Sequence, residues 1–432
     1  MKKVYTDILN NIYLKEEKME LQSCTSNIEW NVINVYPNVK YQKWYGFGGA
    51  FTESACYNIC SLKKEKYENL LFDYFSKNSL NYTLGRIPIG SCDFSLNSYS
   101  YTLKHDKKNI IPVIKDALKY NKIKFMASPW SPPKEWKTNK SLINGGLLKK
   151  SNYQDYAKYL ADFVIDYKKN NIKISYINVQ NEPIATQIWE SCLYLPNEEA
   201  DFLENYLIPT MKKNNIKIDY FIFDHNKDCI YKRVNDTINK GLLNKIFGIA
   251  YHWYTGSHLQ NLDLVHQYYP NCLLYHTESC CKYSEYNKIQ WLKDAELIGL
   301  DILSDMNHYM NAYIDWNLVL DYDGGPNWAS NNCKAPIILN SDKTDYIKTP
   351  IYYYIAHFSK YIKNGYRRIA TSTYFLNIFA VAFTNDKEIV VVVINPNNHI
   401  INYNICIDNS YVNDELNKHS IVTYILKNNK KK

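Results

Sequence analysis

The stretch Ile174-Ser-Tyr-Ile-Asn-Val-Gln-Asn-Glu-Pro183 decides how we interpret this chain. Its Ile and Val residues are typical of a β-strand, and Pro183 cannot continue a hydrogen-bonded ladder. The sequence therefore predicts a strand that runs straight into the carboxylate of Glu182. Asn and Pro also favour simple turns, so the stretch alone leaves a structural turn open. A carboxylate at the C-terminal end of a strand is, however, where a parallel α/β barrel keeps its chemistry.

Seven further strand-like stretches accompany this one along the chain. They cover residues 46–51, 82–88, 124–130, 218–224, 247–254, 272–278 and 312–317. Helix-like stretches lie between several of them, and residues 153–167 carry apolar side chains at the i, i+3, i+4 spacing of a helix. Eight strands in β/α alternation are the number that closes a (β/α)₈ barrel, so we expect an α/β fold of this type.

The chain changes character after about residue 345. Residues 380–383, 388–394 and 421–426 are strand-like and are joined by turn-rich segments, which predicts an antiparallel sandwich. The N-terminal strands lack helices and are expected to complete this module. We therefore divide the chain into N-terminal strands (1–40), a catalytic barrel (41–345) and a C-terminal β-sandwich domain (346–432).

Composition excludes several classes of protein. The chain has 432 residues, of which 46% are hydrophobic and 22% charged, as in an ordinary globular protein. The formal charge of +8 comes from lysines scattered in ones and twos, so we expect no nucleic-acid partner. The sequence contains no run of about 18 apolar residues, so it predicts no transmembrane segment. The sequence leaves the oligomeric state open.

Cysteine usage and the N-terminus bear on location. Eleven cysteines, an odd number with Cys280 and Cys281 adjacent, do not suggest a disulfide framework, and none has zinc-site spacing. The first residues lack the apolar core of a signal peptide. We expect a cytoplasmic protein, with secretion by another route left open.

The glycine-rich segment Tyr45-Gly-Phe-Gly-Gly-Ala-Phe-Thr-Glu53 invites a nucleotide-binding interpretation. It does not match the G-x-G-x-x-G pattern, and no acidic residue follows at the required place. A first barrel strand whose glycines allow close packing fits better.

A second carboxylate, Glu278, ends the predicted strand 272–278. It lies 278 − 182 = 96 residues after Glu182, which is three β/α units of a barrel with about 31 residues per unit. Two carboxylates facing each other across a barrel mouth form the arrangement of a glycosidase. One protonates the leaving oxygen while the other attacks the anomeric carbon or activates water.

Other polar residues at strand ends extend this hypothesis. Arg86 is placed to hold a catalytic carboxylate ionised and Asp93 to accept from sugar hydroxyls, although a structural ion pair is the alternative. Asn181 is placed to donate to a sugar 2-hydroxyl. Aromatic residues, which suit the apolar faces of sugars, gather at the same ends: Trp130, Trp136, Trp189, Trp253, Tyr254, Trp316 and Trp328.

The histidines and cysteines near the predicted strand ends form neither a metal-binding motif nor a nucleophile motif in the sequence. His252 and His276 lie on different predicted strands without a third ligand at suitable spacing, so we expect no metal. Cys280 and Cys281 follow Glu278 but show no Cys–His nucleophile pattern. We expect no cofactor.

The motifs together resemble glycoside hydrolase family 30, and most closely its glucosylceramidase-type branch. The motifs are Gly46-Phe-Gly-Gly-Ala-Phe-Thr-Glu53, Arg86-Ile-Pro with Ser-Cys-Asp-Phe-Ser95, Ala127-Ser-Pro-Trp-Ser-Pro-Pro133, Val179-Gln-Asn-Glu-Pro183, His252-Trp-Tyr254, Thr277-Glu-Ser279, Asp315-Trp-Asn317, Gly324-Gly-Pro-Asn-Trp328 and His357-Phe-Ser-Lys360. They cover about residues 40 to 370 in order.

The resemblance implies a (β/α)₈ barrel with a side β-sandwich built from both termini, and a retaining mechanism. Glu182 would be the general acid/base, with a raised pKa, and Glu278 the nucleophile, with carboxyl groups about 5–5.5 Å apart. The implied substrate-binding residues are Arg86, Asp93, Trp130, Asn181, His252, Tyr254, Trp316 and Asn331.

The implied substrate is a β-glucoside, either a glucosylated lipid or an oligosaccharide. An endo-β-1,6-glucanase or a β-xylosidase on the same scaffold is the alternative within enzymes. From a different class, an inactive carbohydrate-binding protein remains, although the presence of both glutamates disfavours it.

Overall fold

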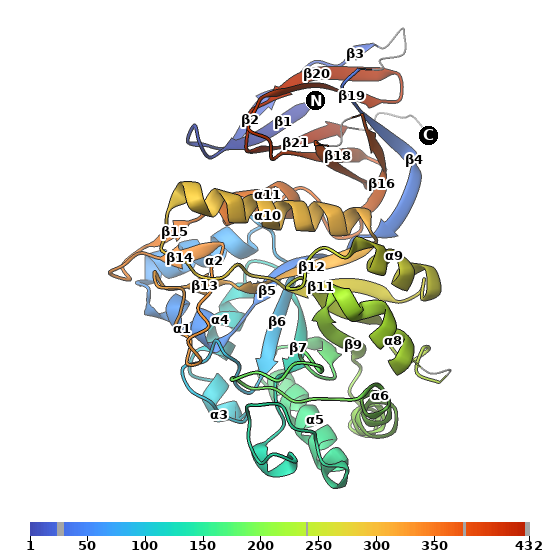
Figure 1. Ribbon diagram of the computed structural model, residues 1–432. Helices are drawn as coiled ribbons and strands as arrows, with labels where there is room; N and C mark the ends of the chain where they lie inside the picture. Colours follow the sequence, from blue (N-terminus) through green and yellow to red (C-terminus); the bar gives the residue numbers. More distant parts are fainter. Residues whose placement is uncertain (24–29, 239–240, 375–376, 428–432) are drawn as a thin grey trace.

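The computed structural model describes residues 1–23, 30–238, 241–374 and 377–427. It places a closed barrel of eight parallel strands beside a separate ten-stranded sheet (Figure 1). Around the barrel the strands follow sequence order: β5 Gly46–Ala50, β6 Leu84–Ile89, β7 Lys124–Pro129, β8 Ile174–Asn178, β9 Asp219–Asn226, β10 Gly248–His252, β11 Leu273–Glu278 and β12 Met310–Asn317. Each overlaps one stretch predicted from the sequence, so the (β/α)₈ prediction is confirmed.

One strand end differs from the prediction. The β8 strand stops at Asn178, and Glu182 lies four residues further on, in a turn where its φ is 46°. Beyond Asn178 the main chain leaves the regular ladder and bonds to the ends of the two neighbouring strands, β7 and β9. The Asn181 N–H donates to the Pro129 carbonyl at 2.8 Å, and the Glu182 N–H donates to the Asp224 carbonyl at 3.0 Å. Glu182 therefore sits above the mouth of the barrel rather than in its wall.

Helices cover the outside of the barrel. Their bounds are α1 Glu53–Ser61, α2 Lys64–Phe75, α3 Leu103–Asp106, α4 Ile110–Ala117, α5 Tyr153–Lys169, α6 Pro196–Phe202, α7 Ile208–Lys213, α8 Ile230–Thr237, α9 Leu259–Tyr268, α10 Lys288–Asn307 and α11 Pro350–Ser359. A π-helical segment, Leu203–Leu207, joins α6 to α7, and 3₁₀ turns occupy Lys134–Trp136, Lys150–Asn152 and Lys227–Cys229. The helix predicted over 153–167 is α5, which buries Tyr156, Leu160 and Phe163 against the barrel.

Close packing inside the barrel depends on small residues in the first two strands. Leu84, Met126, Tyr176, Phe221 and Tyr275 form part of the apolar cluster in the barrel interior. A Cβ added at Gly48 would lie 2.2 Å from the Leu84 carbonyl oxygen, and one at Gly85 would lie 2.8 Å from the ring of Phe125. The glycines of 45–53 thus allow β5 and β6 to approach, as the sequence predicts.

Both ends of the chain build the second sheet. Its strands are, in spatial order, β2 Ile12–Lys18, β1 Lys2–Asp7, β21 Ser420–Lys427, β18 Glu388–Asn395, β17 Phe379–Thr384, β16 Arg367–Thr373, β4 Val32–Lys43, β19 Ile401–Ile407, β20 Ser410–Leu416 and β3 Gln22–Ser23. Neighbouring strands in the described residues are antiparallel except β4 and β19, which run parallel. A small sheet of β13 Val319–Leu320, β14 Ile337–Leu339 and β15 Tyr346–Lys348 lies beside the barrel.

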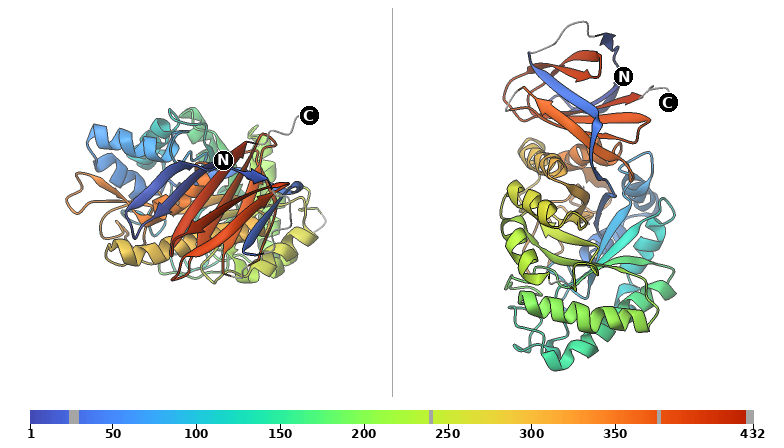
Figure 2. Two further views of the ribbon diagram at one scale, coloured as in Figure 1. Left: turned by 90° about the horizontal axis from the view of Figure 1, so that it is seen from above. Right: turned by 90° about the vertical axis from the view of Figure 1, so that its right-hand side faces the viewer.

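Two helices form the layer between the sheet and the barrel. Figure 2 shows α10 and α11 beneath the sheet, which stands on the barrel as a separate layer. Within this layer His357 of α11 is fully buried between the two chain ends, with its ring nitrogens 2.8 Å from the Thr423 hydroxyl and 2.9 Å from the Thr6 hydroxyl. His357 thereby ties the N-terminal and C-terminal strands to one helix.

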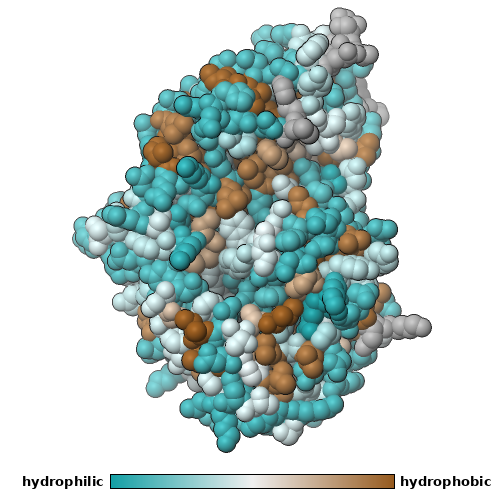
Figure 3. All heavy atoms as spheres, viewed as in Figure 1, coloured by the Kyte–Doolittle hydropathy of each residue, from teal (hydrophilic) through white to brown (hydrophobic). Residues whose placement is uncertain are grey.

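In Figure 3 the face is mostly hydrophilic, with hydrophobic residues in separate small groups. Within the described ranges, every helix is too short or too polar to cross a bilayer.

The buried His357 makes the fold sensitive to acid. Burial lowers the pKa of His357 to about 3, while the unfolded chain titrates near about 6.5. Between these two pKa values the unfolded state binds a proton at this histidine and the folded state does not. The free energy of unfolding therefore falls as the pH drops below about 6.5, by up to about 1.4 kcal/mol per pH unit. We expect His357→Gln to lose less unfolding free energy than the wild type between pH 6.5 and 4.5 in urea titrations. Equal losses in the two proteins would contradict this account.

Candidate active site

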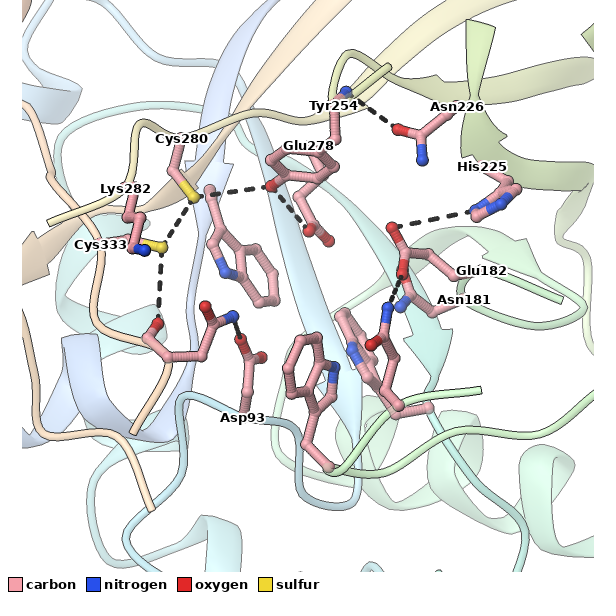
Figure 4. A pocket seen from close by; sticks show the side chains of 15 residues that line it. Asp93, Asn181, Glu182, His225, Asn226, Tyr254, Glu278, Cys280, Lys282 and Cys333 are labelled. Atoms are coloured by element: carbon pink, nitrogen blue, oxygen red, sulfur yellow. Dashed lines mark hydrogen bonds and ion pairs between the residues drawn. The ribbon is translucent and has the colours of Figure 1, made fainter. Parts of the chain in front are cut away.

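A cavity of about 300 Å³ opens at the C-terminal ends of the barrel strands (Figure 4). Of the catalytic and substrate-binding residues proposed from the sequence, eight line it: Asp93, Trp130, Asn181, Glu182, Tyr254, Glu278, Trp316 and Asn331. Arg86 and His252 lie beneath it, each completely buried. The structure thus brings these ten residues to one place, whereas Trp136, Trp253 and Trp328 of the predicted aromatic group do not line the cavity. The sequence did not predict that Gln187, His225, Asn226, Cys280, Lys282 and Cys333 would join Trp189 in the lining.

Arg86, on β6, is the centre of the polar network below the cavity. Its guanidinium donates to the Glu278 carboxylate, to the Asp224 carboxylate at 2.6 Å and to the Asn181 side-chain oxygen at 2.8 Å. Its Nε donates to the Ser128 hydroxyl at 3.1 Å. A guanidinium has fixed donor directions, so these bonds hold the Glu278 carboxylate in one orientation.

Two tryptophans enclose the same guanidinium. The Arg86 Cζ atom lies 4.7 Å from the ring centre of Trp130 and 5.5 Å from that of Trp316. The two indoles stack with centroids 5.3 Å apart and planes inclined by 20°. Cation–π contacts of this kind stabilise a desolvated cation, and the indoles also form an apolar wall of the cavity.

Asp224, at the end of β9, balances the charge of Arg86. Besides Arg86 it accepts from the Asn178 amide at 2.6 Å, from the Thr277 hydroxyl at 2.6 Å and from His252 Nε2 at 3.1 Å. Burial alone would raise the pKa of Asp224, but the charge of Arg86 and the bonds from its neighbours outweigh it and hold the pKa well below the usual range. The Asp224 carboxyl group is therefore ionised at neutral and mildly acidic pH.

His252, at the end of β10, connects Asp224 to Glu182. Its Nδ1 lies 3.2 Å from Glu182 Oε1, while its Nε2 contacts Asp224. Burial lowers the pKa of His252, but the nearby charge of Glu278 and the bonds to Asp224 and Glu182 raise it overall to about 9. At neutral pH the imidazole is charged and both of its nitrogens donate.

This contact reverses one expectation about Glu182. The resemblance implies a raised pKa, and burial acts in that direction. The hydrogen bond and charge of His252, with a smaller contribution from His225, outweigh burial and lower the pKa of Glu182. Gln187 also donates to Glu182 at 3.5 Å. In this arrangement Glu182 takes up a proton only at acidic pH.

Glu278, the last residue of β11, shares its charge with two donors. Arg86 donates to Oε2 and the Tyr254 hydroxyl donates to Oε1 at 3.0 Å. Burial raises the pKa of Glu278, and the cations His252 and Arg86 only partly offset this. One carboxylate oxygen of Glu278 lies within 4.8 Å of a Glu182 oxygen, so the two glutamates face each other at close range.

Asp93 and Asn331 form the opposite side of the cavity. The Asn331 amide donates to Asp93 at 3.1 Å. Burial and the nearby charge of Glu278 raise the pKa of Asp93 well above its usual range. A protonated Asp93 can donate as well as accept, which suits it to bind sugar hydroxyls.

Some side chains at and near the site lie close enough together to be candidate metal ligands. Within the described part of the chain, two groups have donor atoms within 4.8 Å of one another: Glu182, His252 and Glu278, and His276, Asp301 and Asp305. In the first group both ring nitrogens of His252 already contact carboxylates, Nδ1 at 3.2 Å from Glu182 and Nε2 at 3.1 Å from Asp224. In the second, the Lys227 ammonium already bridges Asp301 at 2.6 Å and Asp305 at 2.9 Å. Neither group suits a metal ion.

The opposed carboxylates on a (β/α)₈ barrel, with aromatic walls around them, define the class of barrel glycosidases. Comparison with known sequences agrees. The sequence model of the glycosyl hydrolase family 30 TIM-barrel domain matches residues 44–362, and that of the family 30 β-sandwich domain matches residues 365–424. The chain belongs to glycosyl hydrolase family 30 and is a glycosidase that hydrolyses O-glycosyl bonds.

Individual relatives cover most or all of the chain. The lysosomal acid glucosylceramidase of Mus musculus is 30% identical over 84% of this chain and 77% of its own length. The crystal structure of SrfJ from Salmonella typhimurium superimposes with a TM-score of 0.95 at 30% identity and covers 99% of both chains. An endo-β1,6-glucanase structure has a TM-score of 0.86 at 28% identity, with 98% of both chains covered.

The charge network predicts a large cost for neutralising Asp224. Asp224→Asn leaves buried Arg86 and His252 with one counter-charge fewer, and breaking a buried ion pair costs about 3–5 kcal/mol. We expect urea unfolding to report a loss of about 3 kcal/mol or more for this variant. The control is Asp228→Asn, an exposed carboxylate on the segment that follows β9, which should change stability by less than about 1 kcal/mol. Similar values for both variants would contradict the network.

Proposed function

We propose that the chain is a retaining β-glucosidase of the glucosylceramidase type, with Glu278 as nucleophile and Glu182 as general acid/base. The separation of the glutamates supports this most directly. Their nearest carboxylate oxygens lie within 4.8 Å, in keeping with the about 5–5.5 Å of retaining enzymes and short of the about 6.5–9.5 Å that inversion needs to accommodate a water.

In the first step a Glu278 oxygen attacks the anomeric carbon and the bond to the aglycone oxygen breaks. Glu182 gives its proton to that departing oxygen, so the aglycone leaves as an alcohol. Arg86 holds Glu278 from one side and Tyr254 from the other, which fixes the carboxylate before the reaction begins.

In the second step water resolves the glycosyl-enzyme. The Glu182 carboxylate takes a proton from the water while the water oxygen attacks the anomeric carbon, and Glu278 leaves as a carboxylate. The Glu182–His252 contact favours this half of the cycle, because the imidazolium stabilises an ionised Glu182.

The cavity favours a single sugar ring. Its volume of about 300 Å³ lies at the small end of the usual range for ligand pockets, and its apolar wall of Trp130 and Trp316 suits the flat face of a pyranose. Asp93, Asn181 and Asn331 supply the polar contacts for hydroxyls. The likeness to a lysosomal acid glucosylceramidase makes a lipid-linked β-glucoside the first natural substrate to test.

Glu278 and Glu182 should respond differently to substitution. We expect Glu278→Gln to lower kcat on every substrate by about 10⁴-fold or more, since the covalent route is lost. Glu182→Ala should retain most of the first step on 2,4-dinitrophenyl β-glucoside, whose leaving group needs no proton, and lose it on an alkyl β-glucoside. Steady-state and burst kinetics on the two substrates measure this. Equal losses for Glu182→Ala on both substrates would count against its role as the acid.

The pH profile should depend on His252. Glu182 must be protonated for the first step, so kcat/KM falls as pH rises through its pKa, and the charge of His252 lowers that pKa. His252→Gln removes the cation, so we expect the basic limb of kcat/KM to move up by about one pH unit, even though the maximal rate falls.

His225→Gln is the matched control for this shift. Burial lowers the pKa of His225, so its ring is largely neutral and its loss should move the basic limb less. A basic limb that stays in place or moves down in His252→Gln would contradict the assignment.

A second candidate substrate is β-1,6-glucan. The likeness to an endo-β1,6-glucanase over almost the entire chain favours it over other polysaccharides. Release of a fluorescent aglycone from its β-glucoside, β-xyloside and β-galactoside separates the possibilities. Activity on the β-glucoside supports the glucosidase, whereas a folded protein silent on all three should be tested on β-1,6-glucan.

A further inference from the structure

Two thiols meet at the mouth of the active-site cavity. Cys280 follows β11 two residues after Glu278, and Cys333 lies between β13 and β14. Both line the cavity, and Figure 4 shows their sulfur atoms side by side. The Cys280 thiol donates to Cys333 with the two Sγ atoms 3.0 Å apart, about 1 Å longer than an S–S bond of about 2.05 Å.

The backbone, and not only the side chains, holds these cysteines together. The segments that carry them are joined by one isolated antiparallel bridge, between Lys282 and Cys333. The Tyr283 N–H donates to the Asn332 carbonyl at 3.0 Å, and the Lys334 N–H donates to the Cys281 carbonyl at 2.9 Å. Bringing the sulfurs to bonding distance therefore needs only a small local movement.

Each thiol lies one contact away from a group that faces the sugar. Cys280 Sγ is 3.6 Å from the Tyr254 hydroxyl, which donates to Glu278. Cys333 Sγ is 3.6 Å from the main-chain oxygen of Asn331, whose side chain donates to Asp93. A covalent change at this pair would therefore alter the contacts of Tyr254 on one side of the cavity and of Asn331 on the other.

We propose that Cys280 and Cys333 form a reversible oxidation site. Low-molecular-weight disulfides such as oxidised glutathione oxidise the two thiols to an intramolecular disulfide. Cys280 reacts first because it is partly exposed, whereas Cys333 is 5% exposed. Its thiolate attacks one sulfur of the external disulfide, forms a mixed disulfide and expels one small thiolate. The Cys333 thiolate then attacks Cys280 Sγ and expels the second.

The exchange balances without a further reactant. The two cysteines lose two electrons and two protons, and the external disulfide gains them to become two small thiols. The hydrogen bond to Cys333 and burial raise the pKa of Cys280, so its thiolate is scarce at neutral pH and the reaction accelerates as pH rises. A thiol reductant reverses it.

The disulfide should weaken the sugar site. It removes the Cys280 thiol from its contact with the Tyr254 hydroxyl and joins the β11–α10 segment to the one that carries Asn331. We expect kcat/KM on an aryl β-glucoside to fall at least threefold on oxidation and to recover with dithiothreitol. This activity readout rests on the proposed function, whereas the covalent readout below does not.

The test is a peptide map of the whole native protein. The enzyme is incubated with oxidised glutathione at pH 8.5, free thiols are alkylated, and the digest is analysed by mass spectrometry. The proposal predicts a linked peptide pair containing Cys280 and Cys333, absent after dithiothreitol. Alkylated Cys280 and Cys333 after prolonged incubation, or stable glutathione adducts on both, would overturn it. An enzyme inactive on aryl β-glucosides would still give this map.

Three variants make the map specific. Cys333→Ser should stop the reaction at a glutathione adduct on Cys280, and Cys280→Ser should leave Cys333 free. Cys281→Ser is the matched control, because this adjacent buried thiol does not line the sugar cavity. It should form the Cys280–Cys333 link as the wild type does. Loss of the link in Cys281→Ser would show that another pairing is responsible.

Discussion

The buried guanidinium of Arg86 is the interaction on which the rest of the site depends. It lies with protonated His252 among three carboxylates, those of Asp224, Glu182 and Glu278, where water is largely excluded. Any one of these charges alone would cost several kcal/mol to bury. Together they satisfy one another, and the excess negative charge stays at the two glutamates, which face the anomeric centre of a bound sugar in the proposed mechanism.

The closed barrel assembles this set. Arg86 comes from β6, Asp224 from β9, His252 from β10 and Glu278 from β11, while Glu182 follows β8. Parallel strands present their carboxyl ends at the same rim, so residues far apart in sequence meet within hydrogen-bonding distance. The sheet built from both chain ends stands on the layer of α10 and α11 (Figure 2) and contributes none of these five residues.

Much of this arrangement could be predicted because strand periodicity and strand ends are local signals. The eight barrel strands and the carboxylate that ends β11 follow from such signals. The same signal marks Asp224, whose carboxylate also ends a predicted strand. The position of Glu182 four residues beyond β8 could not be predicted, since it depends on backbone bonds to β7 and β9 that are set by the closed barrel.

Other features depend on contacts between distant segments that no local pattern encodes. The lowered pKa of Glu182 results from His252, a residue 70 positions away. The parallel pairing of β4 with β19 joins an N-terminal strand to a C-terminal one that the whole barrel separates from it in sequence. The meeting of Cys280 and Cys333 depends on how two irregular segments pair, which spacing alone does not indicate.

The most direct test of the central claim is to trap the glycosyl-enzyme. The protein is incubated with 2,4-dinitrophenyl 2-deoxy-2-fluoro-β-glucoside, whose fluorine slows hydrolysis of the intermediate more than its formation, and the labelled peptide is sequenced by mass spectrometry. The account predicts one fluoroglucosyl group per chain, esterified to Glu278, with a matching release of one equivalent of dinitrophenol. A label on any other residue, or steady turnover of β-glucosides without a trapped intermediate, would contradict it.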